Sequence, residues 1–153
     1  MAVVGSGEAT ASHAELAERV GRGLAERGAI VVTGGLGGVM EAASRGAREA
    51  GGTTVGILPG PDRSAANPYV DVAIPTGLGE ARNALVARAA DALIAVGGSW
   101  GTLSEIALAL RAGKRVVGFE SWEVAAPDMP AERILAAADP EEAVELALEG
   151  LGG

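Results

Sequence analysis

The sequence predicts an α/β protein built on an open, doubly wound (Rossmann-like) parallel sheet, and two observations support that prediction. Short apolar runs alternate with segments of helical periodicity along the chain. The apolar runs are continuous rather than alternating with polar residues, which is typical of strands buried on both faces of a parallel sheet. We therefore expect helices on both faces of the sheet and a single domain over residues 1–153.

The strands are expected where short apolar runs end in glycine or proline. The first run, AVVGSG at 2–7, ends in glycines, and the third, TTVGILPG at 53–60, is stopped by Pro59. The expected strands are 2–7, 29–35, 53–60, a short strand within 69–77, 92–98 and 114–120.

Helices are expected between these strands, where apolar residues recur at helical spacing, as they do from Leu16 to Leu24. Ser12 and Glu15 fit a capping box at the start of that helix, and Gly28 fits the residue that follows a helix end. The other expected helices are 38–52, 79–90, 102–113 and a last one capped by Asp139 and Glu142, with loops at 61–68 and 121–130.

Composition excludes several classes of function. The formal net charge of −8 disfavours nucleic acid or an anionic membrane as a partner. The absence of cysteine excludes disulfides, thiolate metal sites and a cysteine nucleophile, and the single histidine, His13, excludes a histidine-rich metal site. The chain contains no apolar run of membrane-spanning length and no signal-peptide pattern at its start, so we expect a cytoplasmic protein without a metal site.

Glycine-rich segments follow the expected strands, at the sheet edge where doubly wound folds bind ligands. The first, Gly5-Ser6-Gly7, lacks two marks of a dinucleotide fingerprint, because Thr10 stands at the third glycine position and the second strand ends in TGG without an acidic residue. The Walker pattern is absent. These departures argue against NAD or FAD binding and against a P-loop kinase or ATPase.

Two further glycine loops, TGGLGGVME at 33–41 and GGSWGTLSE at 97–105, each lead from a strand into a helix. Backbone N–H groups at a helix start form an anion site. The glycines of TGGLGGVME are equally consistent with close packing of the helix against the strand. Together the loops predict one phosphorylated ligand that spans the crevice between them. The expected binding residues are Gly5, Ser6, Gly34, Gly35, Gly37, Gly38, Gly97, Gly98, Ser99, Gly101 and Thr102.

Three larger side chains near these loops each have two interpretations. Thr102 and Glu105 fit a second capping box, so that Glu105 caps a helix or does chemistry. Arg82 is either a solvated surface residue or a bidentate phosphate ligand. Trp100 is a candidate for stacking on a flat ring or for filling a subunit interface.

Together these segments resemble the LONELY GUY (LOG) family and its wider SLOG superfamily, whose members were often labelled lysine decarboxylases. The resemblance covers residues 2 to about 119, and its most specific element is a glycine motif formed here by Gly97, Gly98, Gly101, Thr102 and Glu105. Arg82-Asn83 followed by GGSWGTLSE looks closest to the short branch that includes the molybdenum cofactor carrier proteins.

The resemblance to LOG enzymes implies a phosphoribohydrolase, which cuts the N-glycosidic bond of a nucleoside 5′-monophosphate, with Arg82 and Glu105 as the catalytic pair. A carboxylate near the ribose stabilises the cationic transition state of such a cleavage. No cofactor is required for that reaction. The family also implies a homodimer or homotetramer.

The sequence departs from LOG enzymes at two positions outside these five motif residues. Val96 replaces a proline and Asn83 replaces a lysine. Carrier-type relatives bind a phosphorylated pterin without turning it over. The alternative function is therefore a non-catalytic carrier or sensor whose ligand is the molybdenum cofactor or a nucleotide.

Overall fold

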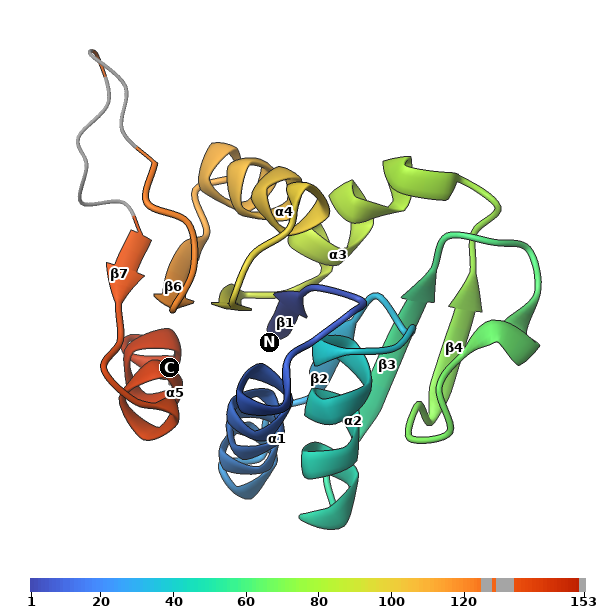
Figure 1. The fold of residues 1–153 in the computed structure, drawn as a ribbon, viewed down its shortest axis with the longest axis horizontal. Helices are drawn as coiled ribbons and strands as arrows, with labels where there is room; N and C mark the ends of the chain where they lie inside the picture. The colour runs from blue at the N-terminus through green and yellow to red at the C-terminus, as the bar shows by residue number, and fades with distance from the viewer. Residues whose placement is uncertain (125–127, 129–133, 152–153) are drawn as a thin grey trace.

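The described part of the chain forms a seven-stranded parallel sheet in the order β4-β3-β2-β1-β5-β6-β7, with helices on both faces (Figure 1). The computed structural model describes residues 1–124, 128 and 134–151. The predicted doubly wound α/β fold is confirmed. The strands are β1 Ala2–Gly5, β2 Val31–Thr33, β3 Thr54–Leu58, β4 Val72–Pro75, β5 Ala92–Val96, β6 Arg115–Phe119 and β7 Ile134–Ala136.

The helices divide between the two faces of the sheet. Helices α1 (Ala11–Glu26), α2 (Val39–Glu49) and α5 (Pro140–Leu148) cover one face, and α3 (Asn83–Ala89) and α4 (Trp100–Arg111) cover the other (Figure 1). Two 3₁₀ turns, η1 (Arg63–Ala65) and η2 (Gly79–Arg82), lie in the connections. No helix of the described residues is both long and apolar enough to cross a membrane.

The apolar runs are continuous because the side chains of each central strand pack into two hydrophobic cores, one on each face of the sheet. In β1 and β5, Val3 and Ile94 pack towards α1, α2 and α5, whereas Val4 and Leu93 pack towards α3 and α4. Successive side chains of a strand point to opposite faces, so a strand covered on both sides must be apolar at every position.

The first expected helix starts earlier than the capping box predicted. Thr10 is its N-cap and accepts a hydrogen bond from the backbone N–H of His13 at 3.1 Å, so Ser12 lies inside the helix and the predicted cap is wrong. Like Ser12, Thr10 has a side-chain hydroxyl, but its backbone is extended and it stands directly before the first helical residue, as an N-cap requires. Gly28 follows the helix end with φ 76°, as predicted.

The last helix begins as predicted. The Asp139 carboxylate accepts a hydrogen bond from the Glu142 N–H at 2.8 Å, and the Glu142 carboxylate accepts one from the Ala138 N–H at 2.7 Å. Strand β7, in contrast, was not predicted. In the predicted loop 121–130, residues 125–127, 129 and 130 lie outside the described residues.

The segment predicted as one helix over 79–90 is divided. Its first four residues form η2, and only Asn83–Ala89 form the α-helix α3. Arg82 is the last residue of η2 and stands at the junction between the two. The tighter turn therefore determines where its side chain lies.

The connections reverse direction between β1 and β5. From β1 the sheet extends through β2 to β4 on one side and through β5 to β7 on the other. In an open α/β sheet, such a reversal leaves a crevice at the carboxyl ends of the two strands, which is where ligands bind. Here that crevice lies between Gly5 and Val96, which are paired in register.

Candidate functional site

A pocket of about 870 Å³ lies at the carboxyl ends of the strands, next to the crevice between β1 and β5. That volume is in the range of small-molecule and cofactor sites. The wall on the α3 and α4 side is the larger one. The lining residues are Gly5, Gly7, Leu36, Met40, Pro59, Gly79, Glu80, Ala81, Arg82, Asn83, Ala84, Ser99, Trp100, Gly101, Thr102, Ser104, Glu105 and Leu108.

Arg82 is buried in the wall of this pocket, with 8% of its surface exposed. Its guanidinium donates a hydrogen bond to the carbonyl of Ile57 at 3.1 Å, but its Nε has no partner in the described structure. Gly34 makes room for the guanidinium, because any side chain at that position would overlap it. Burial lowers the pKa of Arg82, and the charge of Glu105 acts in the opposite direction. A buried cation with an unused donor is suited to an anionic ligand.

Glu105 lines the same pocket from α4 and is 7% exposed. Burial raises the pKa of its carboxyl to about 7, while the charge of Arg82 acts to lower it. The described structure contains neither a hydrogen bond to this carboxyl nor an ion pair between it and Arg82. A carboxyl group that gains and loses its proton near neutral pH is suited to general acid–base chemistry or to meeting an anion while protonated.

The predicted capping role of Glu105 is wrong. Helix α4 begins at Trp100, and its N-cap is Ser99, whose hydroxyl accepts a hydrogen bond from the Thr102 N–H at 3.3 Å. Thr102 therefore lies inside the helix, and Glu105 stands more than one turn past the cap. A capping box requires the acidic residue three positions after the cap, where this chain has Thr102. Helix capping therefore does not explain why Glu105 is buried in the pocket.

The N-terminus of α4 forms the floor of the pocket beside these two residues. Trp100, Gly101 and Thr102 are the first three residues of the helix, where backbone N–H groups have no partner further back in the helix. The hydroxyls of Ser99 and Thr102 lie 3.1 Å apart. The positive end of the helix dipole and these donors favour a negatively charged group here.

The predicted binding residues divide into two groups. Gly5, Arg82, Ser99, Trp100, Gly101, Thr102 and Glu105 line one pocket. Ser6, Gly34, Gly35, Gly37, Gly38, Gly97 and Gly98 do not line it. Several members of the second group have a packing role, because a side chain on Gly35 would meet Leu58 and one on Gly97 would meet His13.

Two residues that support the loops were missed by the sequence analysis. Asn67 is buried; its amide donates to the carbonyl of Leu36 at 2.9 Å, and its backbone N–H donates to Gly35, so it fixes the first glycine loop. Trp122 donates from its indole N–H to the carbonyl of Ser99 at 3.1 Å. The sequence signal for Trp122 was its rarity, since the chain has only two tryptophans. No sequence signal distinguished Asn67 within its polar loop.

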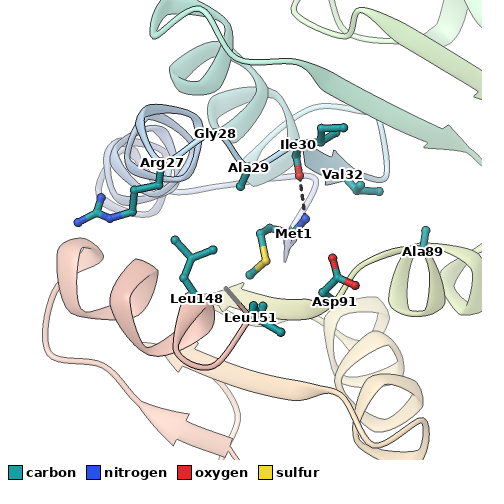
Figure 2. A pocket seen from close by; sticks show the side chains of 10 residues that line it. All are labelled: Met1, Arg27, Gly28, Ala29, Ile30, Val32, Ala89, Asp91, Leu148 and Leu151. Carbon is teal, nitrogen blue, oxygen red and sulfur yellow. Dashed lines mark hydrogen bonds between the residues drawn. The ribbon is translucent and has the colours of Figure 1, made fainter. Parts of the chain in front are cut away.

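A second pocket, of about 590 Å³, lies at the opposite, amino-terminal edge of the sheet (Figure 2). The amino group of Met1 donates to the carbonyl of Ile30 at 2.7 Å there, and Asp91 lies opposite it. None of the predicted site residues lines this pocket. Within the described ranges, no group of three or more histidine, aspartate or glutamate side chains is placed to hold a metal ion.

A parallel sheet with a pocket beside its switch point defines a Rossmann-like ligand-binding architecture. The model of the SLOG cluster4 family matches residues 1–144, and the chain belongs to that family. The predicted resemblance to the LOG superfamily is thereby confirmed. A protein of Archaeoglobus fulgidus is 44% identical over 142 residues, which cover 93% of this chain and 89% of that protein.

Two solved structures resemble the chain over nearly its whole length. The molybdenum cofactor binding protein of Rippkaea orientalis is 38% identical, with a TM-score of 0.85 and coverage of 95% of this chain and 92% of that one. The molybdenum cofactor carrier protein of Chlamydomonas reinhardtii is 36% identical, with a TM-score of 0.86 and coverage of 99% and 97%.

The similarity to a LOG enzyme is shorter. The cytokinin riboside 5′-monophosphate phosphoribohydrolase LOG of rice, Oryza sativa subsp. japonica, is 36% identical over 100 residues, which cover 63% of this chain and 41% of the rice protein. The predicted resemblance to the molybdenum cofactor carriers thus extends further along the chain than the resemblance to LOG enzymes.

Proposed function

We propose that this protein is a carrier that binds a phosphorylated heterocycle, with the molybdenum cofactor as the first candidate, and releases it unchanged. One observation carries the proposal: the buried Arg82 lines the pocket together with the N-terminus of α4, and among the described residues its Nε has no hydrogen-bond partner. A phosphate placed there receives a charged donor and backbone N–H groups together. Residues Gly5, Ser99, Gly101 and Thr102 are the other proposed contacts.

A pterin or purine ring would bind at the edge of the pocket formed by Trp100. Trp100 stands at the edge of the pocket and is 79% exposed, so most of its indole surface is free. Exposing a tryptophan costs free energy that a stacked planar ligand recovers. We propose that the ligand's ring system lies against Trp100 while its phosphate lies at the start of α4.

The two departures from LOG enzymes favour a carrier over a hydrolase. The Asn83 amide donates to the Ser104 hydroxyl at 2.9 Å, so a neutral, already bonded group stands where LOG enzymes have a lysine. Val96 is fully buried as the last residue of β5, where those enzymes have a proline. The long matches to molybdenum cofactor carriers point the same way.

Hydrolysis of a nucleoside 5′-monophosphate is the second candidate function, and Glu105 is the observation that favours it. A carboxyl with a pKa of about 7 is matched to transferring a proton at neutral pH. In this version Glu105 orients water and stabilises the ribosyl cation, and Arg82 holds the phosphate. The catalytic pair proposed from the family would then act as a pair here.

Binding and turnover are separated by one experiment on purified protein. The molybdenum cofactor released from a molybdenum enzyme, AMP and GMP are each titrated against the protein, followed by tryptophan fluorescence, and each mixture is then chromatographed for free base. A carrier binds at least one of them, and the ligand is recovered intact. Release of adenine or guanine that stops in Glu105→Ala overturns the carrier and supports the hydrolase, and binding of none overturns both.

We also propose that the protein assembles as a homodimer or homotetramer. Leu78, which directly precedes η2, and Leu85 of α3 are both exposed. Burying these side chains against a second copy removes apolar surface from water. Light scattering coupled to size exclusion gives the mass directly, and a monomer at micromolar concentration would contradict the proposal.

A further inference from the structure

The chain has only two tryptophans, and they lie against each other beside the pocket. The ring centroids of Trp100 and Trp122 are 5.3 Å apart with an angle of 35° between the planes. This separation is in the range of favourable aromatic pairs. Trp100 is largely exposed, whereas Trp122 is half-buried and packs against the core beneath α3 and α4. Trp122 is therefore the anchored member of the pair.

Trp122 is tied to the loop that leads into α4 by two contacts. Its indole N–H donates to the carbonyl of Ser99, the same carbonyl that accepts the first helical hydrogen bond from Leu103. A Cβ atom on Gly98 would stand 2.6 Å from the indole nitrogen, so the loop runs directly along the ring. Ser99 is also the N-cap of α4. Trp122 thus contacts both the residue at which the helix starts and Trp100 itself.

The chain reaches Trp122 through a backbone conformation that is unfavourable for its residue type. Glu120, two residues earlier, has φ 47° and is the only described non-glycine residue with a positive φ. Such backbone conformations are unfavourable for L-residues and persist where the surroundings hold them. Here the carboxylate of Glu120 lies 3.2 Å from His13 Nε2, and the His13 ring in turn lies against Gly97. The turn at Glu120 directs the chain back over the glycine loop.

We propose that Trp122 is a positioning residue that sets the ring specificity of the pocket, which rests on the proposed function of binding a phosphorylated heterocycle. Trp122 supports one face of Trp100 and fixes the loop that carries it, so the remaining surface of Trp100 is held as a rigid platform for a fused ring. An unsupported exposed indole rotates between rotamers, and a stacked ligand must then stop that rotation. The pocket therefore selects heterocyclic phosphates over phosphates without a ring.

The first test needs no ligand. The variants Trp122→Phe and Trp122→Leu each leave Trp100 as the only tryptophan, but phenylalanine keeps an aromatic partner and leucine does not. We expect the fluorescence anisotropy of Trp100 to be lower in Trp122→Leu than in Trp122→Phe. Equal anisotropy in the two variants overturns the positioning role. Circular dichroism melts check that both variants fold.

The second test measures dissociation constants for ligands with and without a ring. AMP and the molybdenum cofactor are the heterocyclic probes, and ribose 5-phosphate is the ring-free probe. We expect Trp122→Leu to weaken heterocycle binding roughly tenfold, in line with the loss of one base–aromatic stack, and to change ribose 5-phosphate binding less than twofold. Trp100→Leu, which alters an exposed side chain, should reproduce that loss.

The double variant identifies the route of the effect. If Trp122 acts through Trp100, then Trp100→Leu/Trp122→Leu is no weaker than Trp100→Leu alone. Losses that multiply, or that are equal for the ring-free probe, overturn the proposal and assign Trp122 a merely structural role. If the wild type binds none of the three probes, the proposed function fails. The anisotropy difference then still supports the positioning of Trp100.

Discussion

Two loops of similar sequence, TGGLGG at 33–38 and GGSWGT at 97–102, are used in different ways. Both follow a central strand and precede a helix, and both were predicted to hold phosphate. The second loop lines the pocket with Ser99, Trp100, Gly101 and Thr102, whereas Leu36 is the residue that the first loop contributes. A glycine-rich strand–helix loop is therefore a weak guide to function until its packing is known.

The difference comes from what each glycine faces. Side chains on Gly34, Gly35 and Gly38 would overlap Arg82, Leu58 and the backbone of Ser6, so the first loop is filled from within the fold. In the second loop, side chains on Gly97 and Gly98 would overlap His13 and Trp122, but at Gly101 an added Cβ would make only ordinary contacts, at 3.7 and 3.9 Å, with Ser99 and Asn83. The first loop packs around the guanidinium of Arg82, whereas the second loop is packed at its start and has room towards the pocket at Gly101.

The largest effect is expected from Gly38→Ala in the first loop. Gly38 has φ 64° and ψ −130°, a region that only glycine adopts without strain, and its Cβ would overlap Ser6 and Gly7. We expect the free energy of unfolding to fall by about 4 kcal/mol from strain and overlap together. Urea denaturation measures it.

Gly101→Ala in the second loop is the matched control. It lies in the first turn of α4 with a normal helical backbone, and alanine is the better helix former by about 0.5–1 kcal/mol. We expect unchanged or slightly raised stability together with weaker ligand binding. If both variants are destabilised alike, the two loops do not differ in the way described here.

Glu105→Gln tests whether ionisation of the buried Glu105 carboxyl on α4 destabilises the folded protein. The pKa of Glu105 is raised to about 7 from an ordinary value of 4.5, so the native state binds this proton more tightly than the unfolded state does. Stability from this group is complete below about pH 4.5 and falls as the pH rises to about 7, by about 3 kcal/mol. Glutamine lacks this titration.

The measurement is the difference in unfolding free energy between Glu105→Gln and wild type at pH 5 and at pH 8. We expect the variant to gain relative to the wild type as the pH rises. Glu80→Gln, at an exposed carboxyl of the same pocket, is the control and should follow the wild type. A pH-independent difference at Glu105 would contradict the raised pKa.

Ser99→Ala should give the smallest effect. Ser99 caps α4 with its hydroxyl, and the loss of such a cap costs about 1 kcal/mol. Because Thr102 would still offer its N–H and hydroxyl, we expect only a few-fold loss of phosphate affinity. Thermal melts and fluorescence titration check the two parts. A loss of stability above 3 kcal/mol would mean that Ser99 holds more than the helix end.

The fold was predictable because its signals are local. Continuous apolar runs identified the strands β1–β6, Gly28 marked the end of α1, and Asp139 marked the start of α5. Helix starts were less predictable, since Thr10 and Ser99 lie two and three residues before the hydroxyls chosen from the sequence. Several hydroxyl residues stood near each start, and only the backbone conformation decides which one caps.

The site was predictable in its chemistry but not in its supports. Arg82, Glu105 and Trp100 were singled out by residue type and spacing, and one pocket brings them together. Asn67 and Trp122 act on loops 31 and 23 residues away in sequence, so no periodicity connects them to the site. The burial of Arg82 is likewise set by η2, a turn that the sequence presented as part of a helix.

In the proposed function Arg82 anchors the phosphorylated ligand, and two dissociation constants decide whether it does. Arg82→Ala and Arg88→Ala make the same change at the last residue of η2 and in the last turn of α3, but Arg88 is exposed and does not line the pocket. We predict that Arg82→Ala weakens binding of AMP or the molybdenum cofactor at least tenfold, as expected for a charge-assisted hydrogen bond, and that Arg88→Ala changes it less than twofold. Equal affinities in the two variants would show that Arg82 does not hold the ligand.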